Sequence, residues 1–70
     1  MDKKAQIENN FKWHPPKEGQ NERYEQIRAK AKELALLIVD ITPSSREQSV
    51  ALTDLESTVM WANAAIARNE

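Results

Sequence analysis

Thr42-Pro43-Ser44-Ser45-Arg46-Glu47 separates two long stretches of helical pattern and decides how this chain folds. Pro43 ends the first helical stretch, because its ring removes a backbone donor and clashes with the preceding turn. The hydroxyl residues that follow favour a new helix start. The stretch therefore predicts a short turn that joins a helix over 20–41 to a helix over 43–68.

The first residue of the second helix is open to two interpretations. Thr42 can cap the helix with Pro43 at the first helical position, which suits a residue without an amide donor. Alternatively, Ser44 can cap it with Glu47 three residues on, as in a capping box. Both arrangements satisfy free backbone N–H groups at the start of the helix.

Both helical stretches carry apolar residues at alternating spacings of three and four, which is the a/d pattern of packed helices. In the first stretch this seam consists of Tyr24, Ile27, Ala31, Leu34, Ile38 and Ile41. In the second it consists of Gln48, Leu52, Leu55, Val59, Ala62 and Ile66. Two matching seams joined by a short turn predict an all-α fold, an antiparallel two-helix hairpin.

Residues 1–19 form an N-terminal arm to this hairpin. Asp2 can cap a short helix that ends near Asn9-Asn10. Phe11-Lys12-Trp13-His14-Pro15-Pro16, here called the aromatic strap, is expected to be extended, because each proline disfavours helix in the residue before it. The whole chain is thus one domain, residues 1–70.

A chain of this length is not expected to be stable through its own core alone. Seventy residues rarely bury enough core for comfortable stability, and without cysteine neither a disulfide nor a zinc site is expected. No cofactor is indicated. Leu36, Met60 and Trp61 point away from the seams. A homo-oligomer that covers these residues is the simplest solution.

Charge and hydropathy exclude several classes of partner. Ten Lys and Arg against eleven Asp and Glu give a net charge of −1, with the two signs interspersed, so a DNA or RNA polymer is not expected as a partner. No apolar run has the roughly 20 residues of a membrane span, and residues 1–8 do not resemble a signal peptide. The absence of cysteine fits a reducing cytosol.

The residues favour binding over catalysis. The chain has no cysteine nucleophile, no Gly-rich phosphate loop and one histidine, His14. A first candidate site is the start of the second helix, where Ser45, Arg46 and Thr53 offer hydroxyls and a guanidinium to a phosphate. The alternative is ordinary capping, with Arg46 paired to an acidic residue.

A second candidate site follows from antiparallel packing, which brings the start of the first helix beside the end of the second. The polar residues that would meet there, close to the aromatic strap, are Arg23, Tyr24, Arg28, Asn63, Arg68 and Asn69. A tyrosine among arginines can stack on a nucleobase and hold its phosphate. The alternative is that Tyr24 is only the first seam residue and that Arg68 favours a helix C-terminus.

Five segments together resemble a known phage family, the helical-hairpin domain shared by phage inhibitors of CBASS and Thoeris immunity. The segments, which span residues 11–69 in the same order, are Phe11 to Pro16, Arg23 to Arg28, Ser44 to Glu47, Ala51 to Glu56 and Met60 to Asn69. This short form is most similar to the anti-CBASS members.

The resemblance implies a homohexamer that binds cyclic di- and trinucleotide messengers in separate pockets between protomers, without cleaving them, in the cytoplasm of the infected bacterial host. Tyr24 would stack on a base, and Arg46, Thr53 and Arg68 would contact phosphates. The further candidate contacts are Ser45, Arg28, Asn63 and Asn69. Longer members that bind cyclic ADP-ribose signals carry an extra N-terminal domain that this chain lacks, so activity against Thoeris signals is not expected.

A sequestering protein for cyclic oligonucleotides is therefore the leading hypothesis, and an enzyme is not expected. The alternative is a structural or regulatory hairpin module that binds a protein partner through Leu36, Met60 and Trp61.

Overall fold

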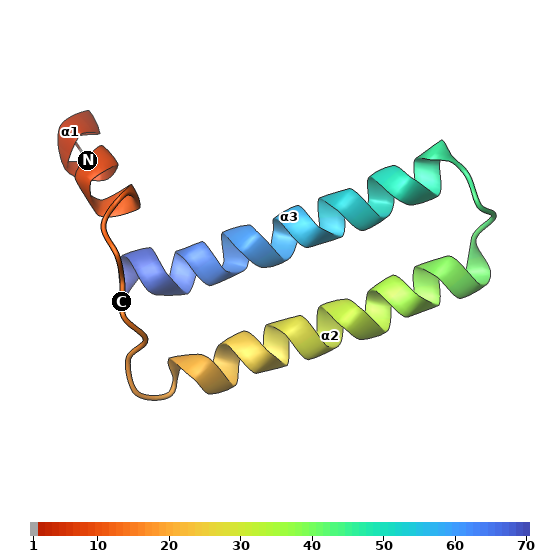
Figure 1. Ribbon diagram of the computed structural model, residues 1–70, viewed down its shortest axis with the longest axis horizontal. Coiled ribbons are helices and arrows are strands. Elements are labelled where there is room, and N and C mark those ends of the chain that lie inside the picture. The colour runs from red at the N-terminus through yellow and green to blue at the C-terminus, as the bar shows by residue number, and fades with distance from the viewer. Residues whose placement is uncertain (1) are drawn as a thin grey trace.

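The computed structural model describes residues 2–70, which form three helices and no strand. The helices are α1 (Lys3–Asn10), α2 (Gln20–Ile41) and α3 (Arg46–Asn69). From the turn after α2, α3 returns alongside it, so that the end of α3 lies near the start of α2 (Figure 1). The all-helical prediction is confirmed.

The arm has the predicted short helix, but the aromatic strap is not extended from its first residue. Phe11 has φ −101° and ψ 3°, and the Lys12 amide donates to the Asn9 main-chain oxygen at 3.4 Å, because the two prolines restrict only the residues directly before them. Asp2 is the N-cap of α1, and its Oδ1 accepts a hydrogen bond from the Lys4 amide at 3.4 Å. The helix ends at Asn10, and the aromatic strap then crosses the end of α3 on its way to α2 (Figure 1).

A glycine makes the entry into α2 possible. Gly19 precedes the helix with φ 81°, a left-handed conformation that costs glycine little and other residues more. Gln20 follows as the one buried residue of the described chain, and its Oε1 accepts from the Lys17 amide at 3.0 Å. The side chain of Gln20 thereby closes the turn that leads out of the strap.

Both predicted caps of α3 are wrong, and the helix runs over 46–69 rather than 43–68. The N-cap is Ser45, whose Oγ accepts from the Gln48 amide at 3.1 Å. Thr42 instead ends α2 in an extended conformation, which the following proline favours, and its hydroxyl donates to the Ile38 carbonyl at 2.6 Å. Pro43 and Ser44 therefore belong to the turn.

The contact between α2 and α3 follows the predicted seam on α3 but departs from it on α2. All six predicted seam residues of α3 are half-buried. On α2, Leu34 and Ile41 are 45% and 70% exposed, and Ala35 takes the place of Leu34 in the contact. A straight helix drifts by about 20° per heptad from a strict 3.5-residue repeat, which rotates the later seam residues out of the contact.

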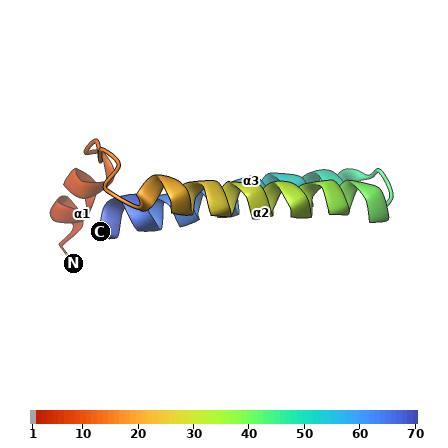
Figure 2. The same cartoon turned by 90° about the horizontal axis from the view of Figure 1, so that it is seen from below.

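The molecule is a flat layer of two helices rather than a closed globule (Figure 2). Its dimensions are 44 × 28 × 16 Å, and its radius of gyration is 15.3 Å. A compact domain of this length would have a radius of about 11 Å. The surface of 5,927 Å² likewise exceeds, by about a third, that of a typical folded monomer of this mass.

No apolar side chain among residues 2–70 is fully buried. The large apolar residues that are most exposed include Phe11, Trp13, Ile41, Met60 and Trp61. A single layer of helices has no second layer to cover its outer faces. Within the same residues, no helix is long and apolar enough to cross a membrane.

Candidate functional site

A pocket of about 460 Å³ opens where the aromatic strap, the start of α2 and the end of α3 meet; it is called the strap pocket below. Its lining consists of Asn10, Lys12, Trp13, His14, Tyr24, Arg28, Asn63, Ala64, Ala67 and Arg68. Figure 1 shows the three segments together at the end of the hairpin that carries the arm. The pocket thus combines residues that lie up to 58 positions apart in the chain.

Four of the predicted site residues line the strap pocket: Tyr24, Arg28, Asn63 and Arg68. Tyr24 and Arg28 are one turn apart on α2, and Asn63 and Arg68 lie in the last two turns of α3. Tyr24, Asn63 and Arg68 are half-buried, whereas Arg28 is exposed. Tyr24 is therefore both a seam residue between α2 and α3 and a lining residue of the strap pocket.

The lining of the strap pocket is cationic. Lys12, Arg28 and Arg68 contribute three positive charges, and no carboxylate is found among the described lining residues. Asn63 adds a buried Oδ1 that has no hydrogen-bond partner within residues 2–70. A buried acceptor without a partner costs free energy, which a ligand donor at this position would recover.

Arg68 is held from two directions. Its main-chain oxygen accepts a hydrogen bond from Asn9 Nδ2 at 3.0 Å. Its guanidinium carbon lies 5.9 Å from the centroid of the Trp61 ring, within the range of a cation–π interaction. The first contact holds the backbone at Arg68, and the second restricts the conformations of its long side chain.

Arg23, which the sequence places in the same cluster, is engaged elsewhere. Its guanidinium donates two hydrogen bonds to the Glu70 carboxylate, one of them at 2.7 Å, and Gln20 Nε2 adds a third at 3.2 Å. The hydrogen bond from Arg23 is the main cause that lowers the pKa of Glu70 to about 2, and those from Gln20 and the charge of Lys17 act in the same direction. The same carboxylate raises the pKa of Arg23.

This ion pair ties the start of α2 to the end of α3 and partly neutralises Arg23. Both side chains remain exposed to solvent, so its contribution to stability is small. The three cations that line the strap pocket form no ion pair with any of residues 2–70.

Ser45, Arg46 and Thr53 lie outside the strap pocket, because they occupy the half of α3 nearer the turn. Ser45 is used as the cap, and its hydroxyl also donates to the Pro43 carbonyl at 3.0 Å. Arg46 is exposed and forms no ion pair with any residue of the described range, contrary to the capping alternative. A single chain does not bring these residues to the other candidates.

Asn69 lines a neighbouring pocket of about 410 Å³ between α1 and α3, together with Trp61 and Arg68. Its Nδ2 donates to the Ala65 carbonyl at 3.0 Å, within its own helix. This predicted residue is thus adjacent to the strap pocket but not in its lining.

Six lining residues were not predicted as site residues, and three of them, Lys12, Trp13 and His14, belong to the aromatic strap. The strap was expected near the second candidate site, and its paired prolines are the signal that its aromatic residues are held in a fixed path. Trp13 is 79% exposed, which leaves its ring available to a ligand or to another protein copy.

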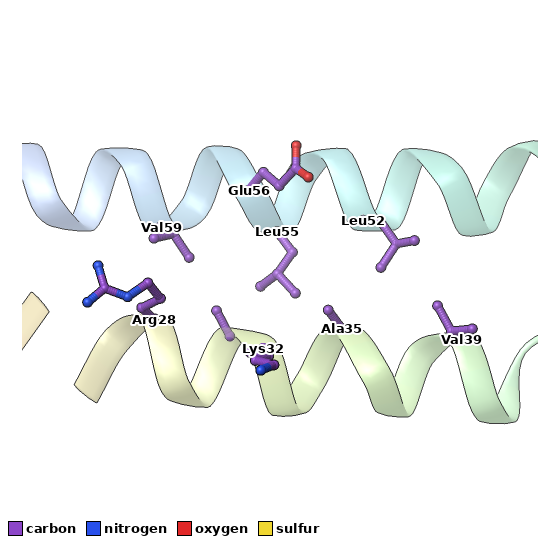
Figure 3. A pocket seen from close by; sticks show the side chains of 9 residues that line it. Arg28, Lys32, Ala35, Val39, Leu52, Leu55, Glu56 and Val59 are labelled. Carbon is purple, nitrogen blue, oxygen red and sulfur yellow. The ribbon is translucent and has the colours of Figure 1, made fainter. Parts of the chain in front are cut away.

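An apolar groove runs between α2 and α3 beyond the strap pocket, with a volume of about 480 Å³. In Figure 3, Leu52, Leu55 and Val59 point from α3 toward α2, and Arg28 lies at the end of the groove nearer the arm. Arg28 thus borders both the groove and the strap pocket.

The chemistry available at the strap pocket is that of binding an aromatic anion. Its side chains supply guanidinium and ammonium groups, aromatic faces and an amide. Residues 2–70 contain no group of three or more His, Asp or Glu side chains placed to hold a metal ion.

Comparison with known proteins identifies the family. The chain matches no curated protein and no solved structure significantly. A family model does match, that of the Acb2/Tad1 hairpin domain, over residues 3–67. This match confirms the resemblance to anti-CBASS and anti-Thoeris proteins that the segments of the sequence indicate. Because it covers almost the whole chain, the protein belongs to the Acb2/Tad1 hairpin-domain family.

Proposed function

We propose that the protein binds cyclic di- and trinucleotide immune messengers and withholds them from the effectors of CBASS immunity, without cleaving them. The observation that carries this proposal is the strap pocket, whose described lining combines aromatic rings with three cations and no carboxylate. Membership of the Acb2/Tad1 hairpin-domain family supports it.

The strap pocket suits the chemistry of a cyclic dinucleotide. Such a ligand presents phosphates, which arginine and lysine bind through charge-assisted hydrogen bonds, and bases, which stack on aromatic rings. Arg28, Arg68 and Lys12 supply the cations, and Tyr24 supplies a ring. The volume of about 460 Å³ falls within the range of small-molecule pockets.

The protein performs this function as a homohexamer in our proposal. The support is the large exposed surface of the single hairpin and its exposed apolar residues, which a second copy would cover. Ser45, Arg46 and Thr53 are assigned to a second pocket, for the trinucleotide, that a neighbouring copy completes.

Sequestration, and not catalysis, is proposed because a binding site of this composition offers no pair of groups arranged for acid–base or nucleophilic chemistry. The site of action would be the cytoplasm of the infected bacterial host, where the messengers are made.

The test mixes the protein with an equimolar amount of cyclic di-AMP and measures free nucleotide in the filtrate by chromatography. We expect depletion of the free ligand and, after heat denaturation of the protein, full recovery of the intact ring. Linear product would show a nuclease, and an undepleted filtrate would refute binding. The experiment is repeated with a cyclic trinucleotide to test the second pocket.

A second function, that of a protein-interaction module, is favoured by one observation. Leu36, Met60 and Trp61 are 58%, 69% and 69% exposed. Light scattering distinguishes the two proposals, because a monomer in solution would leave these residues uncovered and available to a different protein. A hexamer favours sequestration.

A further inference from the structure

The N-terminal end of the aromatic strap is fastened to α3 through one residue, Asn9, near the end of α1. Asn9 Nδ2 donates to the main-chain oxygen of Arg68 at 3.0 Å, across 59 positions of sequence. His14 Nε2 donates to the main-chain oxygen of Asn9 at 2.8 Å. In residues 2–70, no other side-chain hydrogen bond joins α1 to α3.

These two hydrogen bonds meet at residue 9. The bond from His14 joins the strap to the main-chain oxygen of Asn9, which also accepts from the Lys12 amide at 3.4 Å, and the bond from Asn9 joins residue 9 to α3. Loss of the His14 bond therefore loosens the strap beside Trp13, and loss of the Asn9 bond loosens residue 9 from α3. Both are partly buried, so water replaces them poorly when they break.

The two ends of this connection are opposite walls of the strap pocket. His14 is preceded by Trp13, which lines the pocket from the strap, and the oxygen that accepts from Asn9 belongs to Arg68, which lines it from α3. Asn9 itself is absent from the described lining. It can therefore influence a ligand only through the walls that it joins.

The bond from His14 does not depend on the charge of its ring. Donation from Nε2 to a carbonyl oxygen requires a proton on Nε2, which both the corresponding neutral tautomer and the charged ring provide. A glutamine amide can supply a similar donor, whereas alanine cannot. This difference gives a conservative variant that preserves the bond while removing the ring.

We infer that Asn9 and His14 are positioning residues of the strap pocket, which hold the Trp13 wall against the Arg68 wall before a ligand arrives. This inference rests on the proposed function. A wall that is ordered in advance spares the ligand the conformational entropy of ordering it. The strap is thus part of the binding site because of its attachment and not only because of its composition.

The first test uses the protein without ligand. Asn9→Leu approximates the shape of the side chain without its donor and without a new charge, and His14→Ala removes the other bond. We expect the indole N–H resonance of Trp13 to shift in both variants, and the hydrogen-bonded amides of 11–12 to exchange with solvent about tenfold faster. The central amides of α2 and α3 should exchange as in the wild type. Unchanged strap exchange would overturn the inference.

The second test is calorimetry with cyclic di-AMP. Asn9→Leu and His14→Ala should each weaken binding about tenfold, because each leaves part of the pocket wall to be ordered by the ligand. His14→Gln, which retains a donor, should recover part of the affinity that His14→Ala loses. The matched control is Glu8→Gln, an exposed neighbour without a side-chain hydrogen bond in the described chain, and it should bind normally.

Wild-type affinity in either Asn9→Leu or His14→Ala would overturn the inference. Equal weakening in His14→Gln and His14→Ala would mean that the ring contacts the ligand itself, which also overturns a positioning role. If the wild type binds no cyclic dinucleotide, the proposed function fails, and the ligand-free exchange measurement still decides whether the two residues hold the strap.

Discussion

The two ends of the hairpin are held together in different ways. At the end that carries the arm, the contacts join separate segments: Asn9 to Arg68, and Arg23 to Glu70. At the turn end, hydrogen bonds join residues within six positions of one another, such as Gln48 to Thr42 at 3.1 Å. Ile41, beside the turn, is 70% exposed.

The difference explains where a ligand pocket can form. Contacts between segments fix side chains from the strap, α2 and α3 around a common space. Local capping contacts instead use the hydroxyls of the turn for the backbone itself, as Ser45 does for Gln48. A polar cluster in the sequence is thus a better site candidate where the chain meets itself than where it only turns.

The largest expected difference in ligand affinity is between two arginine substitutions, one at each end of the hairpin. Arg68→Ala should weaken cyclic dinucleotide binding by roughly ten- to a hundredfold, because it deletes a charge-assisted contact. Arg46→Ala makes the same change of charge at the turn end and should alter dinucleotide affinity less than about twofold. Calorimetry on both variants measures the contrast. Equal losses would show that the turn end belongs to the same pocket.

Tyr24 tests the aromatic part of the pocket. Tyr24→Ala should reduce dinucleotide affinity about tenfold, since base stacking on an aromatic ring contributes about 1–3 kcal/mol. Tyr24→Phe retains the ring and should bind almost as the wild type does. The oligomeric state, measured by light scattering, should be unchanged in both variants. Unaltered binding of Tyr24→Ala would leave Tyr24 as a seam residue only.

At the turn end, the expected effect is on stability rather than on binding. Ser45→Ala should lower the free energy of unfolding by about 1 kcal/mol, because it removes the N-cap of α3. Ser44→Ala, which removes a hydroxyl with no hydrogen bond among the described residues, should change it by less than about 0.5 kcal/mol. Urea denaturation compares the two, and an equal loss would argue against Ser45 as the cap.

The smallest effect concerns the ion pair at the arm end. Hydrogen bonding lowers the pKa of Glu70 from 4.5 to about 2. The ion pair therefore stabilises the fold fully above pH 4.5, and this stabilisation is lost as the pH falls through 2. In Arg23→Gln, the carboxyl of Glu70 should titrate closer to 4.5. Carbon NMR of the carboxyl group measures the midpoint. Lys30→Gln, which removes the exposed pair with Glu33, should leave it unchanged.

Much of the fold could be predicted because its signals are local. The short first helix, the residue range of α2 and the half-buried face of α3 all follow from caps, prolines and spacing. The cap of α3 was missed because Thr42, Ser44 and Ser45 all have a side chain suited to that role. Only the backbone path after Pro43 selects Ser45.

The site could be predicted in part. Tyr24, Arg28, Asn63 and Arg68 were grouped correctly because helices of known length and register place them at one end. Arg23, an arginine next to Tyr24, was placed in the same group, but it pairs with Glu70, 47 residues away. Sequence alone cannot distinguish a free cation from a paired one, since the partner is defined by distance in space.

By itself, the sequence determined three helices, their approximate limits and an excess of apolar surface, because helix propensity, capping and periodicity depend on neighbouring residues. The tertiary structure alone decided that Leu34 turns outward while Ala35 packs, and that Trp13 and Arg68 face a common pocket. These outcomes depend on the accumulated rotation of a helix face and on where a distant segment returns. Neither the rotation nor the position of the distant segment can be read from a short stretch of the sequence.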